Sequence, residues 1–161
     1  MARRTGEVAG HRPTVPVPAT AACGPVSHAI FRLTRLHRMV AAALLRRVGL
    51  HPGQELLMMQ LWDCGPQRQA DLAALLGSDS ATITRMVRRL ERGGFVRCTP
   101  SATDGRSVIV ESTAAGLALR AEVAQMWHEL ERRTTEGMDE QARTATLDAL
   151  KRMECNLREI G

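Results

Sequence analysis

The stretch from Gln69 to Thr113 reads QADLAALLGSDSATITRMVRRLERGGFVRCTPSATDGRSVIVEST. Its first part is an apolar helical pattern that ends at Gly77, and its second part is a longer, arginine-rich helical pattern that ends at Gly93 and Gly94. Two runs of β-forming residues follow, with turn-forming residues between them. A short helix, a tight turn, a second helix and a hairpin, in this order, predict a winged helix-turn-helix.

Local chemistry accounts for the start of the second helix and for its buried face. Glycine readily adopts the left-handed conformation that ends a helix, so Gly77 is expected to turn the chain. Ser78, Asp79 and Ser80 each carry a side-chain oxygen that can accept from the first free N–H groups, so all three are candidate N-caps. Apolar residues at helical spacing predict one buried face, made of Ile83, Val87 and Leu90.

The hairpin is predicted from the residues that follow the second helix. Residues 95–97 read as one strand, and residues 107–110 read as its antiparallel partner. Arg106 stands where the second strand begins, and a positive side chain on a hairpin tip can enter a narrow, electronegative minor groove. The loop between the strands holds three turn formers, Pro100, Asp104 and Gly105.

The distribution of charge favours a polyanionic partner. The chain has a formal net charge of +5 and a pI of about 9.8. Between Gly77 and Ser107 six arginines stand against three acidic residues, so this short segment holds over half of the net charge. We therefore predict that duplex DNA is bound by residues of the second helix and the hairpin: Ser80, Ala81, Thr82, Thr84, Arg85, Arg88, Arg89, Asp104 and Arg106.

Short motifs along the chain carry a family resemblance. They are LA at 72–73, L at 76, TRM at 84–86, RL at 89–90, GF-V at 94–96, the wing pattern Asp104, Arg106, Val110 and Thr113, and Gln54 and Trp62 within LHPGQELLMMQLWDCG. Together they resemble the MarR (multiple antibiotic resistance regulator) family of winged-helix repressors, over roughly Ser27 to Gly161. The resemblance implies a transcriptional regulator, most simply a repressor; an activator stays open. The sequence has no G-x-S-x-G motif, no phosphate loop and no metal-ligand cluster, so we do not expect an enzyme.

Long amphipathic helices are expected on both sides of the winged helix-turn-helix, which we place at about 52–112. The first covers about 25–48, and two more lie within about 114–160. Thr113 and Asp139 are the expected N-caps of these two helices. One small domain offers little surface to cover their apolar stripes, so a second copy is the expected partner. The resemblance implies the same: a mainly α fold with a small β-wing, assembled as an intertwined homodimer through its terminal helices.

The N-terminal residues differ in composition from the rest. Residues 1–22 are rich in Pro, Ala, Thr and Arg and are predicted to form a mobile arm, whereas 23–161 are predicted to form a single domain. No segment reaches the roughly 20 apolar residues that a membrane span needs, and the N-terminus shows no apolar signal core. We therefore expect a cytoplasmic protein without a membrane partner.

The resemblance also implies a pocket for a small-molecule effector, between the dimer interface and the DNA-binding lobe. An aromatic or anionic ligand would suit apolar walls with few polar groups. Methionine and tryptophan at helical spacing can equally be core residues. The residues expected to line the pocket are His28, Phe31, Arg32, Met59 and Trp62.

Cysteines and histidines form no strong motif. Cys23, Cys64, Cys98 and Cys155 are widely separated and are expected to be reduced thiols. His37 falls on the apolar stripe of the first helix, where core, interface, ligand and metal roles are all open. We expect no cofactor and no metal. The alternatives are a thiol- or metal-responsive regulator of the same fold and a winged-helix protein-interaction module.

Overall fold

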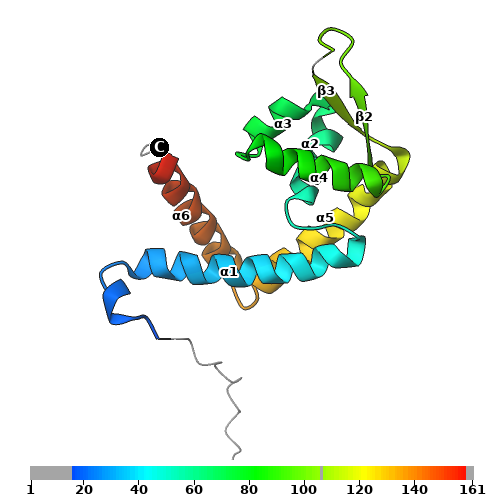
Figure 1. Ribbon diagram of the computed structural model, residues 1–161. Helices are drawn as coiled ribbons and strands as arrows, with labels where there is room; N and C mark the ends of the chain where they lie inside the picture. Colours follow the sequence, from blue (N-terminus) through cyan, green and yellow to red (C-terminus); the bar gives the residue numbers. More distant parts are fainter. Residues whose placement is uncertain (1–15, 106, 159–161) are drawn as a thin grey trace, which may run out of the picture. The chain divides into compact units, whose positions relative to one another are not determined.

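The computed structural model describes residues 16–105 and 107–158 of the chain (Figure 1). The chain divides into two compact units, Met1–Leu36 and His37–Gly161, and the boundary falls inside the first long helix. The predicted division of the chain at residue 22 therefore stays a prediction. Residues 16–22, the described part of the predicted arm, contain a short 3-10 helix.

The chain is mainly helical, with a small antiparallel sheet, as predicted. None of its described helices has the length and apolarity that crossing a membrane requires. The elements in chain order are η1 (Ala19–Ala21), α1 (Pro25–Leu45), η2 (Arg46–Val48), α2 (Gln54–Cys64), β1 (Gln67–Arg68), α3 (Gln69–Leu75), α4 (Ser80–Arg92), β2 (Val96–Pro100), β3 (Val108–Ser112), α5 (Ala114–Thr134) and α6 (Glu140–Arg158).

The sheet has the strand order β1-β3-β2, so β3 is the central strand. Both strands of the hairpin are longer than the sequence predicted, and Cys98 lies opposite Val110 in their register. Pro100 belongs to β2 and not to the loop, which an edge strand tolerates because one side of it needs no ladder hydrogen bond. The sequence did not predict β1, which pairs Gln67 with Val110.

The turn between α3 and α4 forms as predicted. Gly77 has a φ of +57°, and the N–H of Ser78 donates to the carbonyl of Ala73 at 3.0 Å, which closes the end of α3. Of the three candidate caps, Asp79 is the N-cap of α4, because its side chain accepts from the N–H of Thr82. The helix-turn-helix is therefore fixed by local hydrogen bonds.

One hydrophobic core joins the helix-turn-helix, the sheet and α5. Figure 1 shows α2, α3 and α4 gathered beside the β2–β3 hairpin. All three residues predicted to form the buried face of α4 are indeed at most 2% exposed. The largest fully buried side chains are Leu45, Leu50, Leu57, Met58, Leu72, Ile83, Val87, Leu90, Val110 and Val123.

Thr113 connects α4, the wing and α5. Its hydroxyl donates to the carbonyl of Gly94 at 2.6 Å and accepts from the N–H of Gly116 at 3.1 Å, so it is the N-cap of α5 as predicted. A Cβ on Gly116 would lie 2.0 Å from the carbonyl oxygen of Phe95. Only glycine therefore fits here, where the first turn of α5 presses on the base of the wing.

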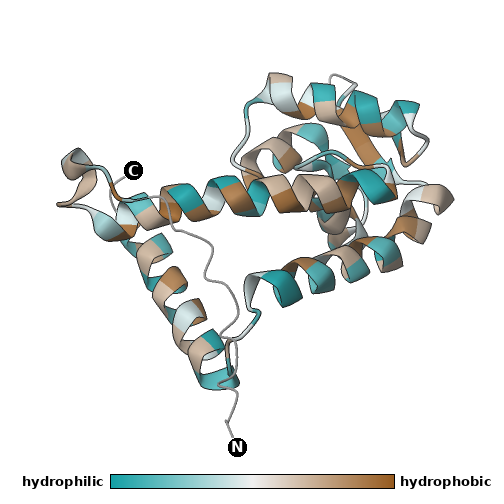
Figure 2. Ribbon diagram, turned by 90° about the horizontal axis from the view of Figure 1, so that it is seen from below, coloured by the Kyte–Doolittle hydropathy of each residue, from teal (hydrophilic) through white to brown (hydrophobic). Residues whose placement is uncertain are grey.

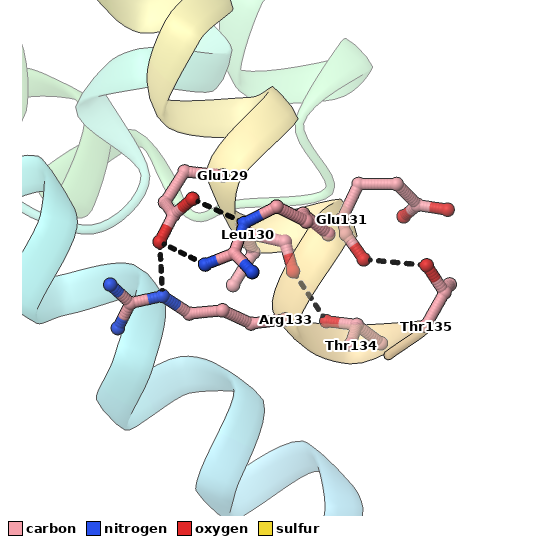
Figure 3. Close-up of polar contacts among 7 residues, drawn as sticks. Glu129, Leu130, Glu131, Arg133, Thr134 and Thr135 are labelled. Carbon is pink, nitrogen blue, oxygen red and sulfur yellow. Dashed lines mark hydrogen bonds and ion pairs between the residues drawn. The ribbon is translucent and has the colours of Figure 1, made fainter. Parts of the chain in front are cut away.

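The last turns of α5 are held by ionic and hydroxyl contacts (Figure 3). Glu129 accepts from Arg132 at 2.9 Å and from Arg133, and these hydrogen bonds lower the pKa of Glu129 to about 2. Thr134 and Thr135 donate to carbonyls one turn earlier in the helix. The end of α5 is thus well ordered before the chain turns into α6.

α6 differs from the other long helices because none of its residues from Glu140 to Arg158 is buried. Its predicted N-cap is confirmed, since Asp139 Oδ1 accepts from the N–H of Ala142 at 2.8 Å. Both hydrophobic and hydrophilic residues lie along it (Figure 2). Its exposed large apolar residues are Leu147, Leu150 and Leu157.

Candidate nucleic-acid interface

α4 has two faces of opposite character. One face is apolar and buried in the core, and it fixes the rotation of the helix about its axis. The opposite face is exposed and cationic, because arginines recur there at helical spacing. The exposed arginines are Arg85, Arg88, Arg89 and Arg92.

A chain of hydrogen bonds orders the first turn of α4. Asp79 accepts twice from Thr82, at 2.8 Å from its N–H and at 2.7 Å from its hydroxyl. The hydroxyl of Thr82 in turn accepts from Nη2 of Arg85 at 3.0 Å. The hydrogen bonds from Thr82, and to a smaller extent the charge of Arg85, lower the pKa of Asp79. Arg85 is therefore held by the residues that start the helix.

Thr84 takes a different position from Thr82. Its hydroxyl donates to the carbonyl of Ser80 at 2.7 Å and accepts from Nε2 of Gln69 at 2.8 Å. Gln69 is the first residue of α3, so this contact joins the two helices of the helix-turn-helix. Ser80 and Ala81, which we also predicted to contact DNA, are exposed on the same first turn.

Three hollows lie along α4, with volumes of about 490, 180 and 390 Å³. The first is lined by arginines of α4 and Glu91. The other two are lined by α4 and by His51 and Gln54, and Gln54 Oε1 accepts from the N–H of His51 at 2.7 Å. The sequence prediction missed His51, because only the fold brings residues 49–54 beside α4.

The wing carries further charged residues. Glu111 on β3 pairs with Arg97 on β2, directly opposite in the register. At the tip, Asp104 Oδ2 accepts from the hydroxyl of Ser107 at 2.6 Å, and the carbonyl of Asp104 accepts from the N–H of Ser107 at 2.9 Å. Asp104 thus stabilises the turn. Arg106 lies outside the described residues, so its predicted contact with DNA stays a prediction.

A separate hollow of about 180 Å³ lies between α2 and α5. Met59 and Trp62, two of the predicted pocket residues, line it, together with Trp127. Trp62 Nε1 donates to the carbonyl of Gly116 at 3.1 Å, and Arg120 pairs with Asp63 at 3.3 Å on the rim. The other predicted lining residues belong to the separate unit Met1–Leu36, so their part in a pocket stays a prediction: His28, Phe31 and Arg32.

The four cysteines are free thiols. Burial, and then the neighbouring Glu91, raises the pKa of Cys98 to about 11, which disfavours its reactive thiolate form. Cys23, Cys64 and Cys155 are exposed. Across 16–105 and 107–158, no group of three or more His, Cys, Asp and Glu residues is placed to hold a metal ion.

Comparison with known proteins agrees with this geometry. Residues 50–108 match the MarR family. The chain is 41% identical over 66 residues to the HTH-type transcriptional repressor NicR of Pseudomonas putida, a match that covers 41% of this chain and 42% of NicR. The matched segment thus spans less than half the length of that relative.

Two solved structures share the fold. A cysteine-to-serine mutant of MarR from E. coli, complexed with operator DNA, has a TM-score of 0.76 and 20% identity, over 85% of this chain and 99% of that chain. Bordetella bronchiseptica BpsR, whose DNA binding is regulated by 6-hydroxynicotinic acid, has a TM-score of 0.72 and 23% identity, over 81% of this chain and 98% of that chain.

The fold and the cationic helix define a winged helix-turn-helix protein. Within it, residues 50–108 match the MarR family, and the described chain is similar in fold to solved MarR structures.

Proposed function

We propose that this protein binds duplex DNA with α4 and the wing and represses transcription. The observation that carries the proposal is the arginine face of α4, held outward by the complete burial of the opposite face. Arginine suits both parts of the task, because its guanidinium pairs with phosphates and reads guanine in the major groove. NicR, a relative of this chain, is a transcriptional repressor, which favours repression over activation.

The DNA-binding form is expected to be a homodimer. α6 exposes three large leucines and buries none of its residues, so its apolar face needs a further surface. Two copies related by a two-fold axis would present two α4 helices to a pseudo-palindromic site, with half-sites about 34 Å apart. The protein-interaction module that we also considered has no comparable observation in its favour.

A small-molecule effector is proposed to control DNA binding from the hollow between α2 and α5. Two tryptophans and Met59 offer flat apolar walls, and Arg120 on the rim can exchange Asp63 for the carboxylate of a ligand. An aromatic acid fits this combination. The DNA binding of BpsR responds to 6-hydroxynicotinic acid, which is a molecule of that class.

The hollow is connected to the wing through one hydrogen bond. Trp62 donates to the carbonyl of Gly116, and Gly116 lies against the backbone of Phe95 and the cap residue Thr113. A ligand that moves Trp62 would therefore disturb the residues that hold the base of the wing. It lowers DNA affinity only if it binds the disturbed arrangement more tightly than the DNA-bound one.

The salt dependence of binding tests the DNA proposal. A duplex recovered from a random-sequence library by the protein itself serves as the probe, and its affinity is measured between 50 and 200 mM salt. In a plot of the logarithm of the association constant against the logarithm of the salt concentration, each phosphate contact contributes a slope of about −0.9. A dimer that uses several arginines should therefore give a slope of about −4 or steeper. A slope near zero, or no recovered duplex, would overturn the proposal.

Tryptophan fluorescence tests the effector site. Trp62 and Trp127 are the two tryptophans of the chain, and both line the hollow. Addition of 6-hydroxynicotinic acid or a related aromatic acid should change the fluorescence over the same concentration range in which it releases DNA. Arg120→Ala should weaken both the fluorescence change and the release of DNA. If an acid releases DNA from Arg120→Ala as well as from the wild-type protein, the effector site does not include Arg120.

A further inference from the structure

The first turn of α4 contains a directed chain of three side chains. The guanidinium of Arg85 donates to the hydroxyl of Thr82 at 3.0 Å, and that hydroxyl donates to Asp79 Oδ2 at 2.7 Å. A threonine hydroxyl has one hydrogen to donate, so its donation to the carboxylate leaves its lone pairs facing the guanidinium. We propose that Asp79 and Thr82 are positioning residues that hold Arg85 for reading a guanine base. This inference rests on the proposed binding of DNA.

The carboxylate of Asp79 performs two tasks with its two oxygens. Oδ1 accepts from the N–H of Thr82 and caps the helix, while Oδ2 accepts from the hydroxyl of the same residue. Capping alone needs only one acceptor, and a serine or an asparagine would supply it equally well. The second acceptor is what orients the hydroxyl, so an acid at this position does more than start the helix.

The chain leaves Arg85 able to bind a base. A guanidinium has five N–H donors, and the contact with Thr82 uses one of them. A bidentate contact with O6 and N7 of guanine needs two of the rest. Arg85 is exposed on the cationic face of α4, so without this support its long side chain would sample many rotamers before binding.

Positioning should affect recognition of sequence more than binding to phosphates. A phosphate can be reached from many rotamers, whereas the paired acceptors of guanine accept few orientations. The loss of one ordered side chain should therefore reduce the preference for a specific duplex by about two- to tenfold for each bound α4. Affinity for a shuffled duplex should change by less than about twofold, because that binding is mainly electrostatic.

Two substitutions separate positioning from capping. Thr82→Val removes the hydroxyl with little change of shape, and Thr82→Ser restores it. Asp79→Asn keeps a good N-cap, but it puts an NH2 group, which donates and does not accept, where Oδ2 accepts from the hydroxyl. Asp139→Asn is the matched control, because Asp139 caps α6 at an equivalent position where the third residue is Ala142, which has no hydroxyl.

The experiment compares affinities for a duplex selected by the wild-type protein and for a shuffled duplex of the same composition. We expect Thr82→Val and Asp79→Asn to lower the ratio of the two affinities and to flatten the guanine preference in a repeated selection. Thr82→Ser and Asp139→Asn should keep the wild-type ratio. An unchanged ratio in Thr82→Val and Asp79→Asn, or an equal loss on both duplexes, would overturn the positioning role. Failure of the wild-type protein to select any duplex would overturn the proposed function itself.

Discussion

α4 and α6 are both amphipathic helices, but of the two only α4 has residues buried by the described part of the chain. α4 buries three apolar residues almost completely and exposes its arginines. α6 is longer, yet Leu147, Leu150 and Leu157 are 53%, 46% and 69% exposed. α4 is held in place by packing against its own chain. The exposed apolar face of α6 can gain stability only by packing against another surface, such as a second copy of the chain.

Removing a core contact of α4 should have the largest effect. Leu90 is 1% exposed, and Leu90→Ala should lower the free energy of unfolding by about 2–5 kcal/mol, from lost burial and the cavity left behind. Urea denaturation measures the change. Leu75→Ala is the control, because Leu75 on α3 is 60% exposed and should cost at most about 0.5 kcal/mol. Similar losses for the two variants would contradict the contrast between covered and uncovered leucines.

A negative charge on the exposed apolar face of α6 should weaken the expected homodimer. The double variant Leu147→Asp and Leu150→Asp should raise the dissociation constant of the homodimer by at least about a hundredfold, because each buried leucine contributes about 1.5–3 kcal/mol. Analytical ultracentrifugation over a range of concentrations measures it. Ala145→Asp adds a charge to another side of the same helix and should leave the dimer intact. A wild-type protein that is monomeric at high concentration would refute the partner assigned to α6.

On the exposed face of α4, Arg85→Ala should remove about 1–3 kcal/mol of discrimination between a selected and a shuffled duplex. The reason is the loss of a contact with a base edge from the first turn of the helix. Fluorescence anisotropy with both duplexes measures the difference. Arg143→Ala, which changes an arginine of α6, should bind both duplexes like the wild-type protein. Equal losses on both duplexes would make Arg85 a phosphate contact.

Features with local causes were predictable from the sequence. Gly77, Asp79 and Thr113 end or begin helices through hydrogen bonds to residues at most five positions away along the chain, and each acts as expected. The buried face of α4 also follows from spacing alone, because helical geometry fixes which residues share a face. This is why the helix-turn-helix and the arginine face were found before the fold was known.

Features that depend on distant segments were missed. β1 consists of Gln67 and Arg68, whose polar side chains carry no strand pattern, and only its pairing with β3 defines it. His51 reaches the hollows beside α4 through the path of the chain between α1 and α2. The pocket itself stays a prediction: Met59 and Trp62 share a hollow, whereas the residues on α1 belong to the other unit.

Glu55 on α2 is a buried acid in the region packed around α4, and its burial is expected to lower the stability of the fold at neutral pH. It is 7% exposed, its Oε2 has no hydrogen-bond partner, and desolvation raises its pKa. A raised pKa in the folded state adds stability below the ordinary pKa of Glu, and this contribution is lost as the pH rises through the folded value. Glu55→Gln should therefore raise the free energy of unfolding at pH 7 by about 1 kcal/mol and flatten its dependence on pH in the acid range. Urea denaturation from pH 4 to pH 7 checks this, and a variant with the wild-type pH dependence would contradict it.

The smallest effect is expected at Glu129, where α5 ends before the chain enters α6. Hydrogen bonds from Arg132 and Arg133 lower the pKa of Glu129 to about 2, so its contribution to stability is present above the ordinary pKa of Glu and is lost as the pH falls towards 2. Both arginines lie in the last turn of α5, where positive charge also suits the helix dipole, and all three groups are partly or well exposed. Glu129→Gln should therefore fray the end of α5 at neutral pH without unfolding the core. Hydrogen exchange of the amides near Thr134 should speed up in the variant at pH 7, and the amides around Leu90 should be unchanged. Equal acceleration near Thr134 and around Leu90 would mean that the end of α5 and the packed core unfold as one unit. The region around α4 would then be no more stable than the region where the chain enters α6.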